Sequence, residues 1–134
     1  MINNETSNIL YEVSTNKNIE EVANDLKESL MEVSFGVLAE INLGDKIRAK
    51  GIEYTEKLIA FEVCNPVYAD SVMKTSDLVK YLLPCKITLS TDSGKTIIGT
   101  VDFSGFEGLL NDEAKDIALE VISKLKIAID KASK

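Results

Sequence analysis

Both cysteines and both prolines of this chain lie in one short stretch, residues 61–89. An apolar strand is expected to run into Cys64, Asn65 and Pro66, and an Asn-Pro pair suits the start of a helix. A thiol beside a helix N-terminus loses its proton more easily than a free thiol, because the helix dipole favours the thiolate. The stretch therefore predicts Cys64 as a residue that could do chemistry, with Cys85 as its helper.

Two interpretations of the cysteines are open at this point. Cys64 ends one strand and Cys85 begins the next, so both are expected at the same end of the sheet as a thiol pair. Side chains alternate between the two faces of a strand, and this parity opposes a disulfide. Cys64 follows an inward-facing position and is expected to face outward, whereas Cys85 shares the inward face of Ile87. Cysteine is also among the residues most often buried, so the favoured interpretation is two small core side chains.

The Asn-Pro pair also has two interpretations. Asn65 and Pro66 are typical of a capped helix start that needs no ligand. Alternatively, free backbone amides there, near Ala69, bind an anion. Capping is favoured because most helix N-termini are capped. The candidate ligand-binding residues are Cys64, Asn65, Pro66, Ala69, Glu62, Pro84 and Cys85.

Three glutamates form a further candidate site. Glu12, Glu40 and Glu62 share one sheet face by parity, and neighbouring strands would gather them around a hard cation or raise the pKa of one carboxyl. Solvated glutamates are far commoner, which favours three separate surface charges.

The chain has no histidine. This excludes Ser-His-Asp and Cys-His catalysis and histidine metal sites. The sequence also has no P-loop, GxGxxG or HExxH motif, and two cysteines alone cannot complete a four-ligand zinc site. We therefore expect no cofactor and no metal, and we favour a binding protein over an enzyme.

Length and charge restrict the partners. We expect one domain spanning residues 1–134, because a chain of this length rarely buries two cores. Fifteen Lys and Arg against 22 Asp and Glu give a net charge of −7, and the basic residues are scattered, so neither nucleic acid nor an anionic membrane is an expected partner. No signal-peptide core and no run of eighteen apolar residues is present, which predicts a cytoplasmic protein with free thiols.

Hydrophobic periodicity predicts the elements that position these residues. Alternating, β-branched stretches predict five strands, at residues 8–14, 37–43, 57–64, 86–91 and 95–102. Two long helices with one apolar face are predicted at residues 19–33 and 112–132, the first capped by Asn18 and the second by Asn111 or Asp112. Short helical segments are predicted at residues 45–50 and 67–73, the second resuming through 78–82 until Pro84. Asp92-Ser93-Gly94 predicts a hairpin turn.

This order predicts an α+β fold, with a mostly antiparallel sheet of about five strands and both long helices on one face. By parity, the helix-covered face carries Ile9, Tyr11, Val13, Val37, Ala39, Ile41, Ile59, Phe61, Val63, Ile87 and Leu89. The opposite face, called the open face below, carries Leu10, Glu12, Leu38, Glu40, Leu58, Glu62, Lys86, Thr88, Ile98 and Thr100. A half-apolar open face is typical of a partner surface, so we expect a homodimer across it or its edge.

The Cys64-Asn65-Pro66 and Leu83-Pro84-Cys85-Lys86 segments together resemble the domain-of-unknown-function 302 family of small bacterial and archaeal proteins. The resemblance covers roughly residues 10 to 103 and includes Phe35-Gly36-Val37-Leu38, Ala69 and Gly94. Phe103 departs from it, since the family usually has proline after the aspartate matching Asp102. The resemblance implies a dimeric β-α-β4-α arrangement, similar to the helix-grip fold of TATA-binding-protein-like domains, and it implies no activity.

Two functional hypotheses follow. The first is a non-enzymatic, dimeric domain that binds a small ligand or a partner protein on its open face. The second is a thiol-dependent redox, sulfur-transfer or metal-handling protein that uses Cys64 with Cys85. A hydrolase built on paired carboxylates is a more distant third.

Overall fold

One antiparallel sheet forms the centre of the fold, with its strands in the order β1-β5-β4-β3-β2. The structure is a computed structural model that describes residues 9–106 and 108–134. The five predicted strands are confirmed with small changes at their ends, while Asn8, where the first was predicted to start, lies outside the described residues. They are β1 (Leu10–Thr15), β2 (Gly36–Asn42), β3 (Leu58–Cys64), β4 (Cys85–Asp92) and β5 (Lys95–Val101).

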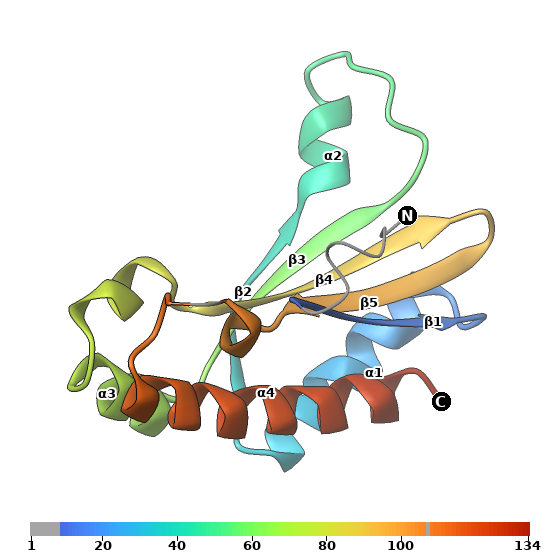
Figure 1. The fold of residues 1–134 in the computed structure, drawn as a ribbon. Helices are drawn as coiled ribbons and strands as arrows, with labels where there is room; N and C mark the ends of the chain where they lie inside the picture. Colours follow the sequence, from blue (N-terminus) through green and yellow to red (C-terminus); the bar gives the residue numbers. More distant parts are fainter. Residues whose placement is uncertain (1–8, 107) are drawn as a thin grey trace.

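Two long helices, α1 (Ile19–Glu32) and α4 (Asp112–Ala132), lie side by side on one face of this sheet (Figure 1). Each begins at its predicted cap: the Asn18 side chain accepts a hydrogen bond from the amide of Glu21, and Asn111 accepts one from the amide of Ala114. The predicted α+β fold is therefore confirmed. The shorter helices are α2 (Leu43–Arg48), α3 (Pro66–Met73) and the 3₁₀ turns η1 (Asp77–Tyr81) and η2 (Phe103–Gly105).

The main core lies between the sheet and the long helices. Its largest fully buried side chains come from both layers and are Phe61, Leu26, Leu30, Ile87, Leu89, Ile98, Leu125 and Ile129. Removing a side chain of this size from water stabilises the fold by roughly 1.5–3 kcal/mol. Apolar burial along these two helices therefore fixes the sheet that carries the cysteines.

The turn between β4 and β5 corrects one part of the predicted face assignment. Ser93 and Gly94 have φ of 52° and 83°, as a type I′ turn requires. This two-residue turn pairs odd positions of β4 with even positions of β5, so Leu89 lies opposite Ile98. Ile98 belongs to the main core and Thr100 is buried. Their predicted place on the open face is wrong, because one parity was assumed for both strands.

A bulge near the start of β2 corrects a second part. Beyond it Glu40 lies opposite Phe61, and its carboxylate is 2.7 Å from Nζ of Lys27 on α1. Residues directly opposite in an antiparallel pair share a face, so Glu40 faces the long helices. By the same register Ala39 and Ile41 lie on the open face, so the predicted sides of all three are wrong: the extra residue of the bulge shifts the parity.

The alternative of a carboxylate cluster, which the sequence disfavours, is contradicted by the bulge and by the strand order. Glu40 lies on the helix-covered face, and strands β5 and β4 separate Glu12 in β1 from Glu62 in β3. Within residues 9–106 and 108–134, no group of three or more His, Cys, Asp or Glu side chains is placed to hold a metal ion. The three glutamates are therefore separate charges.

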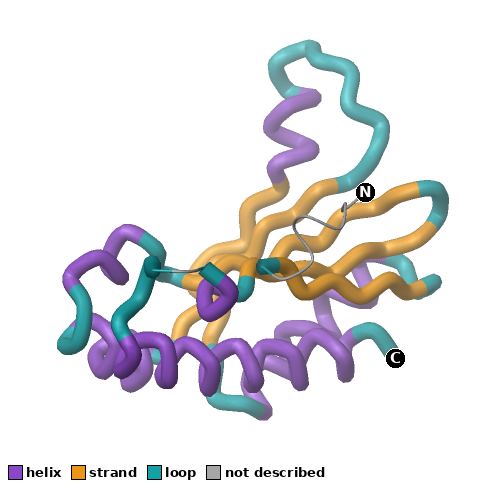
Figure 2. Tube along the Cα trace, viewed as in Figure 1, coloured by secondary structure: helices purple, strands orange, loops and turns teal. Residues whose placement is uncertain are grey.

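Away from the long helices, α2 and the loop after it project from the ends of β2 and β3 (Figure 2). The corrected open face is mixed, with Leu10, Glu12, Ala39, Ile41, Ala60, Glu62, Thr88, Ile97 and Val101. In the part of the chain that the structure describes, no helix has the length and apolar character needed to span a bilayer. The cytoplasmic location and the likeness to TATA-binding-protein-like domains stay predictions.

The connection from α1 to β2 turns at Ser34 rather than at Gly36. Ser34 has a positive φ of 68°, and the amide of Phe35 donates to the carbonyl of Leu30 across the turn. Helices commonly end on one residue in this left-handed conformation, usually glycine. Gly36 is instead the first residue of β2.

Candidate functional site

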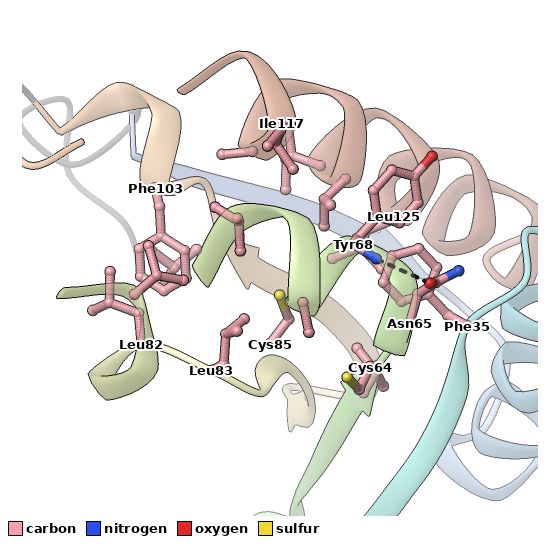
Figure 3. Close-up of a pocket in the computed structure, with 18 of the residues that line it drawn as sticks. Phe35, Cys64, Asn65, Tyr68, Leu82, Leu83, Cys85, Phe103, Ile117 and Leu125 are labelled. Carbon is pink, nitrogen blue, oxygen red and sulfur yellow. Dashed lines mark hydrogen bonds between the residues drawn. The ribbon is translucent and has the colours of Figure 1, made fainter. Parts of the chain in front are cut away.

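A small cavity lies where the end of β3 and the start of β4 meet α3, η1 and α4 (Figure 3). Its volume is about 60 Å³. The described side chains that line it include no Asp, Glu, Lys or Arg. They are Phe35, Val63, Cys64, Asn65, Tyr68, Ala69, Val72, Val79, Leu82, Leu83, Cys85, Val101, Phe103, Leu110, Ile117, Ala118, Val121, Ile122 and Leu125.

The start of α3 forms one wall. The Asn65 side-chain oxygen accepts hydrogen bonds from the amides of Val67 and Tyr68, at 2.9 and 3.2 Å, and Pro66 occupies the first helical turn. The Asn65 side-chain nitrogen donates to the carbonyl of Ser34 at 2.8 Å, which ties α3 to the turn before β2. The predicted capping role of Asn65 and Pro66 is therefore confirmed. An anion at this terminus would have to displace an existing cap.

Tyr68 connects α3 to the rest of the site. Its ring stacks on Phe35, with centroids 6.1 Å apart, and its hydroxyl donates to Glu120 of α4 at 2.9 Å. Both burial and this hydrogen bond raise the pKa of the tyrosine, burial having the larger effect. Tyr68 thus spans the cavity wall, with its ring inside and its hydroxyl at the surface.

A second, smaller apolar cluster closes the site. Val72 of α3, Val79 of η1 and Ala114 of α4 form its buried centre. Leu83, Leu110 and Ile117 pack around it. The segment from α3 through η1 therefore covers the cavity by packing against the first turns of α4.

The two cysteines line the cavity at its sheet end, and both thiols are free. Val63 lies directly opposite Cys85 in the register, so Cys64 points to the other face, as parity predicts. Figure 3 shows both cysteines among the side chains that line the cavity. The geometry therefore opposes a bridge between them.

Cys85 is a poor candidate for thiolate chemistry. Burial, with smaller contributions from the nearby Cys64 and Glu62, raises the pKa of its thiol to about 11. At neutral pH this thiol is protonated, whereas the thiolate is the nucleophile and the metal ligand. Glu62 lies outside the cavity lining, 3.4 Å from Nζ of Lys86 on the neighbouring strand.

The structure brings some of the predicted ligand-binding residues together. Cys64, Asn65, Ala69 and Cys85 line the cavity, whereas Glu62, Pro66 and Pro84 do not. Sequence reasoning missed most of the apolar wall, including Phe35, Tyr68, Val72, Leu83 and Leu125. Their periodicity indicates burial, and it carries no signal that part of the buried space is empty.

Comparison with known proteins identifies a family and a similar solved structure. The family model "Domain of unknown function DUF302" matches residues 11–132. The chain is similar to the crystal structure of an uncharacterized conserved protein DUF302 from Bacillus stearothermophilus, with 32% sequence identity and a TM-score of 0.88. The match covers 92% of this chain and 98% of that chain. No curated protein matches.

Proposed function

The chain belongs to the DUF302 family of domains of unknown function, and from the cavity we propose that it is a binding module. In this proposal the ligand enters the cavity between α3, η1 and α4. The observation that carries the proposal is an empty space of about 60 Å³ whose described lining side chains are all uncharged. The proposal moves small-ligand binding from the open face, where the sequence predicts it, to the end of the sheet where β3 ends and β4 begins.

Binding is favoured over catalysis by the state of the polar groups around the cavity. The thiol of Cys85 is protonated at neutral pH because its pKa is raised to about 11. The Asn65 side chain already bonds two amides and one carbonyl. The chain has no histidine to act as a general base. These groups shape a pocket and supply no activated nucleophile.

The size of the cavity bounds the affinity. At about 15 Å³ for each water-sized group, it holds on the order of four such groups. Burying four methylene groups yields roughly 3 kcal/mol, which is weaker than the ~4 kcal/mol of a millimolar complex. Tighter binding needs contacts outside the cavity. Val67 and Tyr81, 74% and 75% exposed on α3 and η1, are apolar side chains available for such contacts.

Xenon and small alcohols test the proposal by methyl NMR. We expect dose-dependent shifts of the methyl groups of Val72, Ile117 and Val121, all of which line the cavity. Ala69→Leu fills the cavity and should abolish the shifts. Ala49→Leu is the matched control, because Ala49 is exposed at the end of α2, outside the cavity lining. Absent shifts, or shifts that survive Ala69→Leu in a folded protein, would remove the proposal.

We also propose that two copies of the chain associate through the open face or its edge. The support is the mixed character of that face, where Ile97 is half-buried and Val101 is 36% exposed. Light scattering at micromolar concentration should give twice the chain mass of 14.7 kDa. A single species at the chain mass would contradict the dimer and leave the cavity proposal standing.

Thiol chemistry at Cys64 is the second candidate function. Cys64 is half-buried and ends β3 directly before the cap of α3. Alkylation by iodoacetamide near pH 7, followed by peptide mass spectrometry, separates the two candidates. Rapid labelling of native Cys64 supports thiol chemistry, whereas labelling only in denaturant rejects it.

A further inference from the structure

We infer that the cavity selects uncharged, hydrocarbon-like ligands and rejects carboxylates and other anions of the same size. The inference rests on the proposed binding function and specifies its ligand. It comes from the hydrogen-bonding state of every polar side chain in the described cavity wall. The wall contains four such side chains, Cys64, Asn65, Tyr68 and Cys85.

Most of the strong donors in this wall already have partners within the protein. One N–H of the Asn65 side chain donates to the carbonyl of Ser34, and the two α3 amides beside it donate to the Asn65 oxygen, so the second Asn65 N–H is the remaining strong side-chain donor. The Tyr68 hydroxyl donates its single proton to Glu120. The two thiols are weak donors. A buried carboxylate would therefore lose its hydration and gain at most one strong side-chain donor, the second N–H of Asn65, which is strongly unfavourable.

The charges nearest the cavity act in the same direction. Glu62 lies close enough to Cys85 to raise the pKa of that thiol, and Glu120 accepts from Tyr68 at the outer edge of the wall. Lys86 partly offsets Glu62 from 3.4 Å, with 55% of its own side chain exposed. An approaching anion thus meets these two carboxylates beside the cavity, and Lys86 is already paired with one of them.

The size of the space also restricts the ligand. Because about 60 Å³ holds on the order of four water-sized groups, a chain of three or four carbon atoms fits without rearrangement of α3. The inferred ligand class is therefore a short, neutral alkyl or small ring compound, or a longer molecule that inserts such a group.

A matched pair of ligands tests this selectivity. We expect 1-butanol to shift the cavity methyl signals of Val72 and Val121 at millimolar concentration, and butanoate at pH 7 to bind at least ten-fold more weakly. Equal binding of the two ligands would overturn the inference and leave the binding function intact. Binding of neither ligand would overturn the proposed function, so the two failures are distinct.

The Glu62→Gln variant shows whether the wall or the nearby charge sets the selectivity. Glu62 does not line the cavity, so 1-butanol should bind this variant as it binds the unmodified protein. The preference over butanoate should also persist, because the described wall still has no cationic group to replace the hydration of a carboxylate. Butanoate binding that rises to match 1-butanol in this variant would contradict the inference.

Discussion

The two apolar clusters of this protein differ in size and in content. The main core holds seventeen buried apolar residues of the described chain and spans both long helices and the sheet, whereas the cluster beneath α3 and η1 has three. The smaller cluster borders the cavity, and its cover is a short helix and a 3₁₀ turn. Stability varies across a structure with the density of buried contacts. The main core therefore contributes most of the packing that holds the fold, and under the proposed function the smaller cluster is the part that opens to admit a ligand.

Hydrogen bonds between distant segments add to the difference between the two clusters. Around the main core, Nζ of Lys17 donates to the carbonyls of Ala132 and Lys134 at the end of α4, and the Tyr11 hydroxyl donates to Asp130. These bonds join residues that are more than a hundred positions apart in the chain. Lysine at a helix C-terminus also complements the helix dipole. The end of α4 next to the main core is thereby fixed to β1 and the loop after it.

The largest expected effect is the difference between one truncation in each cluster. Phe61→Ala removes a fully buried ring from the main core, and it should lower the free energy of unfolding by about 3–5 kcal/mol. Val79→Ala removes two methyl groups from the smaller cluster, so its loss should stay below about 2 kcal/mol. Urea unfolding followed by circular dichroism measures both. Equal losses of unfolding free energy in the two variants would contradict the difference between the two clusters.

The pH dependence of stability sharpens the comparison at the cavity wall. The pKa of the Cys85 thiol is raised in the folded protein from 9.0 to about 11, so the unfolded chain releases this proton first. The contribution of the protonated Cys85 thiol to the free energy of unfolding is fully present below pH 9 and is lost as the pH rises to 11. It amounts to at most about 2.7 kcal/mol, at about 1.4 kcal/mol for each pKa unit.

Cys85→Ala should therefore flatten the fall in unfolding free energy between pH 9 and pH 11. Val121→Ala, another change in the cavity wall, should keep the slope of the unmodified protein, because it removes no titrating group. Urea titrations at several pH values measure the slopes. If the two variants have the same slope, Cys85 is not the buried thiol that the structure describes.

The helix caps provide a third comparison, with an expected cost of about 1 kcal/mol each. Asn18→Ala removes the cap of α1 and Asn65→Ala removes the cap of α3. Loss of the α1 cap should speed amide hydrogen exchange throughout the main core, because α1 packs on the sheet and on α4. Loss of the α3 cap should speed exchange in α3 and η1 alone. Exchange that spreads to β3 and β4 in Asn65→Ala would show that the smaller cluster is not independent.

The sequence predicts the elements better than it predicts the faces of the sheet. Strands, long helices, caps and the hairpin follow from local patterns, which a single sequence contains. The sides of Glu40 and Ile98 depend on a bulge and on a two-residue turn, and each of these shifts the parity by one position. The alternation of apolar and polar residues in the sequence does not reveal such a shift. The sides assigned beyond the bulge in β2, and those of Ile98 and Thr100 in β5, were therefore wrong while the strands were right.

The candidate site was predictable only in its polar part. Cys64, Asn65, Ala69 and Cys85 stand out by residue type and by their position at element ends, and all four line the cavity. The apolar wall comes from residues far apart in the chain, such as Phe35 and the cavity-lining residues of α4. An apolar residue beside an empty space has the same periodicity as one in a filled core. The existence of a cavity is thus a property of the packing and not of any motif.

The smallest expected effect is a gain in stability at Ser34, beside the main core. Its φ of 68° is unfavourable for a residue with a side chain, whereas glycine adopts it freely. Ser34→Gly should raise the free energy of unfolding by roughly 0.5–1 kcal/mol, because the relief of strain exceeds the extra entropy of glycine in the unfolded chain. Ser76→Gly, at an extended φ of −157° between α3 and η1, should instead lower it by up to about 1 kcal/mol. Urea midpoints that move in the same direction for both variants would show that the left-handed turn at Ser34 carries no strain.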